Sequence, residues 1–390
     1  MKIRRILLLA GEESGLVYAE RLKDSLQDAR PDEVMEFHGY QSEGFKTADL
    51  AVMGFWPVLK RLFFFLGVAR AMKRLIREWR PEAVVTVDYP GLNLKLAAYA
   101  KARGIPAVHL VCPQVWAWHQ GRIPKVAAAL TKLLCFFPFE PPLFKDTGLD
   151  ARFIGHPLAD MCAAEENASA GRRLEGGFPC QSPRIALLPG SRIGEIQRIL
   201  PRLLQALHLL PGGQDGQDAQ EFKKKIRVLL PAANERAYAE IERQVRANPP
   251  PASFQLEIVR GRAREILRQV DCAAVASGTA TLEAALARCP TVLVYAVSPL
   301  LAWFARRVIK GVRHIGLANV IAEKTDTPPP MPELLQEAFT PEAVAARLSE
   351  WLADSDARAK AVAALDATMA RLKSDGDALG NAAREILSCM

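Results

Sequence analysis

The sequence predicts an α/β protein made of two doubly wound, Rossmann-like domains that face a cleft. Short apolar, β-rich runs alternate with helical Ala/Leu/Arg stretches along almost all of the 390 residues. These runs lack polar alternation, which is typical of parallel strands covered on both faces. The chain is also longer than one hydrophobic core usually fills, so two domains are expected.

Nine strands are predicted, with crossover helices between them. The strands are Ile3–Leu9, Ala83–Val87, Ala107–Val111, Leu133–Phe136, Ile185–Leu188, Ile226–Leu230, Leu256–Val259, Cys272–Ala276 and Thr291–Val294. The clearest helical stretches are Leu94–Arg103, Ile199–Leu209 and Thr281–Arg288. The apolar pattern stops over Ala163–Pro183, which predicts domains at 1–165 and 183–345 and a C-terminal helical segment at 346–390. Pro211–Gln220 has no periodicity and is predicted to be an exposed loop.

Composition excludes several classes of protein. With 50% hydrophobic and 24% charged residues, the chain holds enough apolar surface to fold. No apolar run approaches the ~20 residues of a membrane-spanning helix. Met1–Ala10 is interpreted as a buried strand and not as a signal peptide, because Glu12 and Glu13 follow at once. Seven scattered cysteines without a CxxC motif predict neither disulfides nor zinc, and they favour a reducing compartment.

The net charge of +8 is concentrated in two segments. Residues 56–80 carry seven bases and one acid, and residues 299–313 carry four bases and no acid. Phe55–Arg80 is also rich in aromatic and aliphatic residues, which suits a helix lying on an anionic membrane. A core helix with a solvated basic face would have the same pattern. Nucleic acid is disfavoured as a partner, because the aromatic residues cluster instead of alternating with bases. The candidate membrane residues are Phe63, Phe64, Phe65, Arg70, Lys73 and Arg74.

Ligands of open parallel sheets bind beyond the carboxyl ends of the strands, and two motifs follow strands in the C-terminal half. In Ala276–Glu283, Gly278 lets the backbone approach a ligand, and the helix start offers free N–H groups to an anion. Glu283 lies one helical turn after Thr279. This separation would match a nucleotide whose phosphate lies at the helix start and whose ribose diol lies on Glu283. An ordinary N-cap followed by a surface glutamate explains the same spacing.

The second motif is Pro189-Gly190-Ser191-Arg192, in which the guanidinium suits a diphosphate. A plain turn with a capping serine is the alternative. Two such junctions in one domain favour a nucleotide diphosphate site. Neither motif matches a Walker A loop or a GxGxxG fingerprint, which disfavours ATPases and dehydrogenases.

Several motifs of the N-terminal half also follow strands. Asp88 ends the strand Ala83–Val87, where a carboxylate could accept a proton from a substrate hydroxyl or could simply cap the next helix. Trp116 and Trp118 could form a sugar or acyl platform or pack the domain edge. His156 follows another short apolar run, and it could equally be a hinge or core histidine.

Taken together, these motifs resemble those of the lipid-A-disaccharide synthases, which are membrane-associated glycosyltransferases of the two-domain GT-B type. The similar stretches follow the family's order from residue 5 to about residue 345. They are Gly11–Gly15, Val52–Gly54, Asp88–Asn93, Pro113–Trp118, Pro138–Glu140, Phe153–Asp160, Leu187–Arg192 with Glu195, Ala276–Ala285 and Pro332–Gln336.

The resemblance implies inverting transfer of 2,3-diacylglucosamine from its UDP derivative to the 6-hydroxyl of 2,3-diacylglucosamine 1-phosphate, without a metal or other cofactor. It places the enzyme in the cytoplasm, at the cytoplasmic face of the inner membrane of a Gram-negative-type bacterium, and it allows a homodimer. Asp88 is our candidate general base. The residues assigned to the nucleotide sugar are Gly190, Ser191, Arg192, Ser277, Gly278, Thr279, Glu283 and Asn319. Those assigned to the acceptor side of the cleft are Glu12, Ser14, Gly15, Asn93, Gln114, Trp116 and His156.

This sequence departs from the family pattern at four places. Leu16 stands where the family has Asp, Ala296 where it has Arg, and Ala318 where it has Pro. Ala322-Glu323-Lys324 replaces Ala-Gly-Arg, and an insertion follows through Pro330. Because Leu16 and Ala296 remove polar groups, an alternative function stays open at this point: a UDP-sugar-binding homologue with another acceptor, with epimerase-like chemistry, or without turnover.

Overall fold

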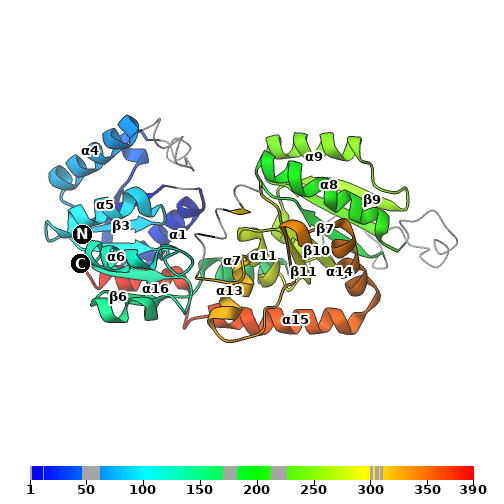
Figure 1. Cartoon of the computed structure of the whole chain (residues 1–390). Coiled ribbons are helices and arrows are strands. Elements are labelled where there is room, and N and C mark those ends of the chain that lie inside the picture. Colours follow the sequence, from blue (N-terminus) through cyan, green and yellow to red (C-terminus); the bar gives the residue numbers. More distant parts are fainter. Residues whose placement is uncertain are drawn as a thin grey trace. The chain divides into compact units, whose positions relative to one another are not determined.

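The chain forms two compact units, each built around one six-stranded sheet (Figure 1). Unit 1 comprises Met1–Met161 and Leu372–Met390, and unit 2 comprises Cys162–Arg371. The computed structural model describes residues 2–11, 13–45, 62–169, 182–211, 226–298, 302–303, 307 and 311–390.

The sheet of unit 1 is parallel and has the strand order β2-β1-β3-β4-β5-β6. Its strands are β1 (Lys2–Ala10), β2 (Glu33–His38), β3 (Ala83–Val87), β4 (Ala107–Leu110), β5 (Lys132–Cys135) and β6 (Asp150–Phe153). Its helices are α1 (Glu13–Ala29), α4 (Leu62–Trp79), α5 (Pro90–Lys101), α6 (Ile123–Ala129) and α16 (Ala378–Leu387). The strand order reverses between β1 and β3, and ligand sites of doubly wound sheets lie at such a reversal.

The sheet of unit 2 is also parallel, with the order β12-β11-β10-β7-β8-β9. Its strands are β7 (Arg184–Leu188), β8 (Ile226–Ala232), β9 (Phe254–Arg260), β10 (Cys272–Ala276), β11 (Thr291–Tyr295) and β12 (Glu333–Leu335). Its helices include α8 (Ile193–Leu209), α9 (Glu235–Ala247), α10 (Ala263–Leu267), α11 (Thr279–Leu286), α13 (Leu317–Lys324), α14 (Pro341–Ala353) and α15 (Ser355–Met369). This is the classic Rossmann order, with its reversal between β7 and β10.

Apolar layers cover both faces of each sheet, which explains the unbroken apolar runs of the strands. In β1, Ile6 and Leu8 belong to one buried cluster, while Leu7 and Leu9 belong to another on the opposite face. Successive side chains of a strand point to opposite faces, so both faces of β1 are packed. The predicted fold class of two doubly wound α/β domains is therefore confirmed.

The boundaries of the units differ from those predicted. The first boundary lies between Met161 and Cys162, inside α7 (Pro157–Ser169). Residues 346–390 do not form a separate segment: α14 and α15 belong to unit 2, and the chain from Leu372 onward belongs to unit 1. There α16 packs against α1, and Glu385 forms an ion pair of 2.9 Å with Arg152. Figure 1 shows the C-terminal helix α16 among the elements of unit 1. Most of the predicted loop at 211–220, and residues 170–181 of the predicted seam, lie outside the described residues.

In the part of the chain that the structure describes, no helix has the length and apolar character needed to cross a bilayer.

Candidate active site

A cavity of about 1410 Å³ lies in unit 2 at the carboxyl ends of its strands. Its walls are formed by the segments that follow β7, β8, β9 and β10, together with parts of α7 and α11. The cavity therefore includes the point where the strand order reverses. Seven of the eight predicted nucleotide-sugar residues line it: Gly190, Ser191, Arg192, Ser277, Gly278, Thr279 and Glu283.

Gly278 shapes the wall that follows β10. It has φ 148° and ψ −162°, a conformation that residues with a side chain rarely adopt, and it is the N-cap of α11. The first N–H groups of α11 accordingly begin at the cavity wall, where they and the helix dipole favour an anion. Thr281 closes the first turn, because its Oγ1 donates to the carbonyl of Gly278 at 2.8 Å.

The wall that follows β7 carries a guanidinium held by a carboxylate. Gly190 has φ 107°, and a Cβ atom there would lie 2.7 Å from Oε2 of Glu195. Glu195, in the first turn of α8, bonds Nη1 of Arg192 at 3.1 Å through its Oε1. The side chain of Arg192 is still 65% exposed, so a ligand in the cavity can approach its guanidinium.

Glu283 lies deeper in the same cavity, one turn into α11. Burial raises the pKa of its carboxyl, and the nearby Arg264 partly offsets this effect. Arg264 and Arg268 are themselves held by Glu165 of α7, at 3.2 and 2.9 Å. The cavity thus combines arginines, a helix N-terminus and a partly buried carboxylate, which suits a ligand with a diphosphate and neighbouring hydroxyls.

Two walls of the cavity were missed by the sequence analysis, and one predicted residue lies elsewhere. Pro231–Ala233 lie at the carboxyl end of β8, and Gly261–Arg264 follow β9. The rule that ligands bind beyond strand ends could have found both. Asn319 is a correction: it is fully buried, and its amide is bonded to Met331 and Glu333 and does not line the cavity. It joins α13 to the strand β12.

In unit 1, the candidate base lies where the strand order reverses. Ala10 and Val87 pair at the ends of β1 and β3, so Gly11 and Asp88 follow neighbouring strand ends. A Cβ atom on Gly11 would lie 2.6 Å from the ring of Tyr89, so glycine leaves room for that ring. Burial raises the pKa of Asp88, while a hydrogen bond from the backbone of Tyr89 acts in the opposite direction.

Several residues predicted to face the acceptor are buried instead. Asn93 is fully buried and hydrogen-bonded to the backbone around Asp88. His156 is buried, and its backbone N–H donates to Leu372 at 3.3 Å; burial lowers its pKa to about 4. It is therefore a core histidine that contacts Leu372, the residue at which the chain re-enters unit 1. Gly15 is buried and Gln114 is exposed. Glu12 and the side chain of Ser14 lie outside the described residues.

Trp116, assigned to the acceptor side, is buried, and Glu140 holds its ring. Its Nε1 donates to Oε1 of Glu140 at 3.1 Å, and the backbone N–H of Phe137 donates to Oε2, also at 3.1 Å. Burial raises the pKa of Glu140 to about 8. Trp118 is 40% exposed, so it alone of the two tryptophans presents a sizeable surface to a ligand.

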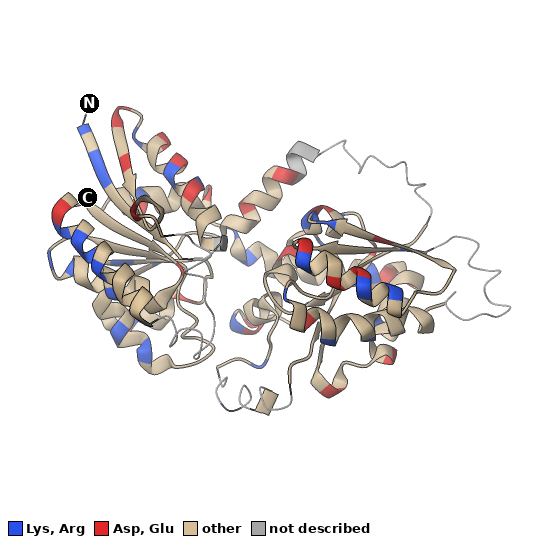
Figure 2. Cartoon of the chain, turned by 90° about the horizontal axis from the view of Figure 1, so that it is seen from above, with Lys and Arg blue, Asp and Glu red and all other residues tan. Residues whose placement is uncertain are grey.

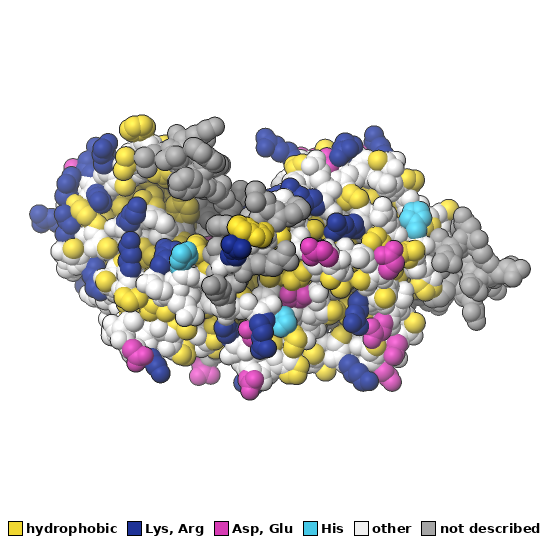
Figure 3. Space-filling view, in the orientation of Figure 1, with side chains coloured by type: hydrophobic (Ala, Val, Ile, Leu, Met, Phe, Trp, Pro, Cys, Tyr) yellow, Lys and Arg dark blue, Asp and Glu magenta, His cyan; other side chains and the backbone are white. Residues whose placement is uncertain are grey.

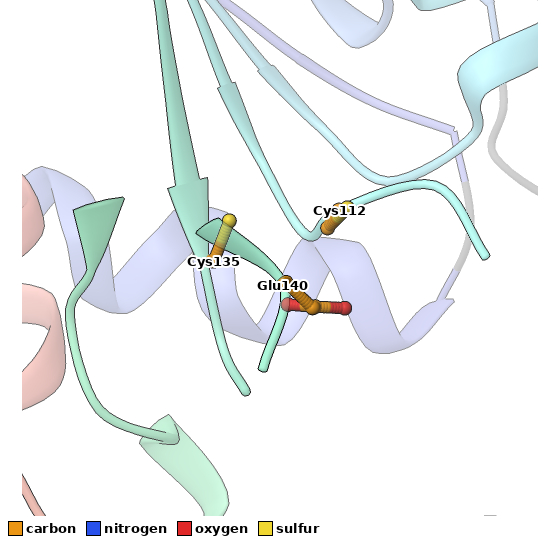
Figure 4. Close-up of side chains that lie close together, drawn as sticks. All are labelled: Cys112, Cys135 and Glu140. Carbon is orange, nitrogen blue, oxygen red and sulfur yellow. The ribbon is translucent and has the colours of Figure 1, made fainter. Parts of the chain in front are cut away.

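Two thiols lie beside this carboxyl group. One donor atom each of Cys112, Cys135 and Glu140 lies within 4.8 Å of the other two, and among the described residues this is the group spaced to hold a metal ion (Figure 4). Both oxygens of Glu140 already accept N–H hydrogen bonds, and burial raises the pKa of Cys135 well above its ordinary value. The local chemistry therefore favours protonated thiols packed against a carboxyl group that supports the loop at Trp116.

Helix α4 has a buried face and an outer face of mixed character. Val68, Met72 and Ile76 are fully buried at the helical spacing of four residues. At the start of the helix, the outer face carries the exposed apolar residues Phe63 and Leu66, and Phe63 is 86% exposed. Further along the helix, this face carries basic residues. Those exposed bases are Arg70, Arg74 and Arg77. Figure 2 shows the charged residues along the ribbon, and Figure 3 shows apolar and basic side chains together over α4.

The fold is of the GT-B type. Two Rossmann-like units in one chain occur in the nucleotide-sugar enzymes of the GT-B type. The structure is similar to a UDP-N-acetylglucosamine 2-epimerase of Listeria monocytogenes, with TM-score 0.58, 10% identity and coverage of 99% of this chain and 95% of the other. It is also similar to the calicheamicin glycosyltransferase CalG4, with TM-score 0.55, 15% identity and coverage of 99% and 98%. At these identities the likeness concerns the fold alone.

Sequence similarity identifies the family within this class. The family model of lipid-A-disaccharide synthetase matches residues 6–386. A lipid-A-disaccharide synthase of Anaeromyxobacter sp. strain K is 36% identical over 99% of this chain and 97% of its own length. One of Neisseria meningitidis is 35% identical, covering 90% and 89%. The chain belongs to the lipid-A-disaccharide synthetase family and is a glycosyltransferase of lipid A biosynthesis.

Proposed function

We propose that the enzyme transfers 2,3-diacylglucosamine from UDP to the 6-hydroxyl of 2,3-diacylglucosamine 1-phosphate, with inversion. The products are the β-1,6-linked disaccharide 1-phosphate and UDP. The observation that carries the proposal is the cavity of unit 2, where Arg192, the start of α11 and Glu283 meet from two separate strand ends.

In this proposal unit 2 holds the donor. The N–H groups at the start of α11 and the guanidinium of Arg192 bind the diphosphate, and Glu283 accepts hydrogen bonds from the ribose hydroxyls. The same N–H groups and guanidinium stabilise the negative charge that UDP gains as it leaves. Because arginine and a helix N-terminus supply this stabilisation, we propose transfer without a metal or other cofactor.

Unit 1 supplies the base. The carboxylate of Asp88 takes the proton of the 6-hydroxyl as that oxygen forms a bond to C1 of the donor sugar. The bond between C1 and the β-phosphate oxygen breaks, and its electron pair leaves with UDP. Attack from the side opposite UDP inverts the configuration at C1. A carboxylate with a raised pKa is a stronger base than an ordinary aspartate, which suits this role.

We further propose that α4 rests on the cytoplasmic face of the inner membrane, where acylated substrates reside. The exposed Phe63 and Leu66 would enter the boundary of the acyl chains, and Arg70, Arg74 and Arg77 would meet anionic head groups. This arrangement brings the enzyme to its lipid substrates.

The departures at Leu16 and Ala296 do not change the lining of the cavity. Leu16 packs against the buried cluster of unit 1, and Ala296 belongs to the core cluster of unit 2. Neither residue lines the cavity. This favours turnover over the alternative of a non-catalytic homologue.

Purified enzyme incubated with UDP-2,3-diacylglucosamine and 2,3-diacylglucosamine 1-phosphate is expected to form the disaccharide 1-phosphate and UDP in equal amounts. Mass spectrometry of the lipid fraction measures the first product, and chromatography the second. Donor without acceptor is the control, because an epimerase would isomerise the sugar there. Binding of UDP without any disaccharide would contradict the proposal.

Replacing Phe63 and Leu66 by serine is expected to abolish flotation with phosphatidylethanolamine–phosphatidylglycerol vesicles. The change removes the exposed apolar side chains of the outer face of α4, and serine has no comparable membrane affinity. Phe64 and Phe65, also predicted to meet the membrane, are half-buried against the core of unit 1 and stay unchanged. Val17→Ser, an exposed apolar site on α1, is the matched control and should float like the unmodified protein. Raised salt should weaken flotation, because it screens the arginines. Equal flotation of both variants would rule out α4 as the membrane contact.

A further inference from the structure

We propose that Asn93 and Tyr40 are positioning residues, which hold Asp88 in the backbone conformation that directs its carboxylate. The proposal rests on the proposed function, in which Asp88 is the base. It assigns Asn93 a role behind Asp88 in place of contact with the acceptor.

The backbone at the candidate base is in a conformation that its residues do not prefer. Asp88 and Tyr89 both have φ 51°, and ψ of Tyr89 is 56°, so two consecutive residues with side chains adopt the left-handed region. Aspartate tolerates this region better than most residues do, but a tyrosine rarely enters it. Such a pair persists only where surrounding contacts hold it in place.

Asn93 provides these contacts. Its Nδ2 donates to the carbonyl oxygen of Asp88 at 2.7 Å, and it also lies 3.3 Å from that of Val87 and 3.2 Å from that of Leu9. One amide group therefore ties the turn at Asp88 to the ends of β3 and β1. The N–H of Asp88 is held as well, because it donates to the carbonyl of Leu110 in β4 at 3.0 Å.

Tyr40 fixes the amide of Asn93 in turn. Its hydroxyl donates to Oδ1 of Asn93 at 2.6 Å, so both ends of the amide are engaged. The side chain of Asn93 is fully buried and Tyr40 is 2% exposed. Neither presents an atom to a substrate. A buried polar chain of this kind makes one arrangement of the backbone preferable to others.

The two alternatives for Asn93 differ in what they predict for Tyr40. If Asn93 binds the acceptor, removing a hydroxyl behind it should chiefly raise the acceptor KM. If Asn93 orients Asp88, the same removal loosens the turn and lowers kcat, while substrate affinity stays the same. A displacement of about 1 Å at a reacting group can lower the rate by about 100-fold.

The test uses the full-length protein in the disaccharide assay. Tyr40→Phe is expected to lower kcat about 10-fold with unchanged acceptor KM and unchanged affinity for UDP. Asn93→Ala is expected to lower kcat about 100-fold, and the double variant should be no slower than Asn93→Ala alone, because the two residues act as one unit. Tyr99→Phe, at a half-buried tyrosine of α5, is the matched control and should keep full activity.

Each other outcome counts against a specific part of the account. Wild-type kcat in Tyr40→Phe overturns the positioning role, as does a rise confined to the acceptor KM. A kcat that returns to normal once corrected for the folded fraction, measured by circular dichroism, shows a structural role only. If Asn93→Ala does not fold, Tyr40→Phe alone decides. Full turnover in Asp88→Asn would instead remove Asp88 as the base, and UDP binding without any disaccharide would overturn the proposed function, so these failures are distinguishable.

Discussion

Asp88→Asn is expected to lower kcat by about 100- to 10,000-fold, which is the range of a lost general base. Asparagine is nearly isosteric with aspartate but cannot accept the proton of the acceptor hydroxyl. The affinity for UDP should be unchanged, because the residues that hold UDP in this account belong to unit 2. Steady-state kinetics and a UDP titration by calorimetry measure the two quantities. Unchanged turnover would remove Asp88 from the mechanism.

The pH dependence of the unmodified enzyme tests the same role. Burial raises the pKa of Asp88 above the ordinary 3.8, and the base acts only when ionised. Activity should therefore fall as the pH falls through this raised pKa, and the residual activity of Asp88→Asn should lack that acid limb. A profile with the same acid limb in the variant would assign it to another group.

Asp88→Asn should not lower stability, which separates a functional residue from a structural one. The fold favours the protonated form of Asp88, so the stability linked to its proton is fully present below the ordinary pKa. It is lost as the pH rises through the raised pKa. At neutral pH the uncharged asparagine avoids this loss, so the midpoint of thermal unfolding should stay the same or rise.

Arg192→Ala is expected to lower kcat/KM for the UDP-sugar by about 100- to 1,000-fold. This is the usual effect of removing one hydrogen-bond donor that stabilises a developing negative charge. The guanidinium is 65% exposed and bound to Glu195, so its removal should change thermal stability little. Steady-state kinetics with varied donor measures the effect.

The matched control is Arg198→Ala. Arg198 lies on the same helix, bonds the carbonyl of Gly194 and does not line the cavity. Its loss should leave kcat/KM near the value of the unmodified enzyme. Equal losses in both variants would indicate a general charge effect in place of a diphosphate contact.

The sequence predicts the central strands well and the edge strands poorly. β3 and β10 have the predicted bounds, because strands covered on both faces carry unbroken apolar runs. β2, β6 and β12 were missed. All three are edge strands with mostly half-buried residues, so their sequences lack that signal. The return of α16 to unit 1 could not be predicted either, since it depends on contacts far apart in sequence.

The candidate site shows a similar division. Residues that follow β7 and β10 come together because parallel strands end at one edge, which topology alone predicts. Asn93, Trp116 and Asn319 were assigned to ligands, although their polar groups bond other parts of the protein. A motif conveys which residue stands at a position but not which way its side chain points. Glu140, which anchors Trp116, received no role because a buried carboxyl group has no local sequence signature.

A crystal structure of the protein with UDP tests the central claim most directly. The account predicts the diphosphate within hydrogen-bonding distance of the backbone N–H groups of Gly278 and Thr279 and of the guanidinium of Arg192. It also predicts the ribose hydroxyls on the carboxylate of Glu283. UDP bound outside this cavity, or with its diphosphate turned away from the start of α11, would contradict the account.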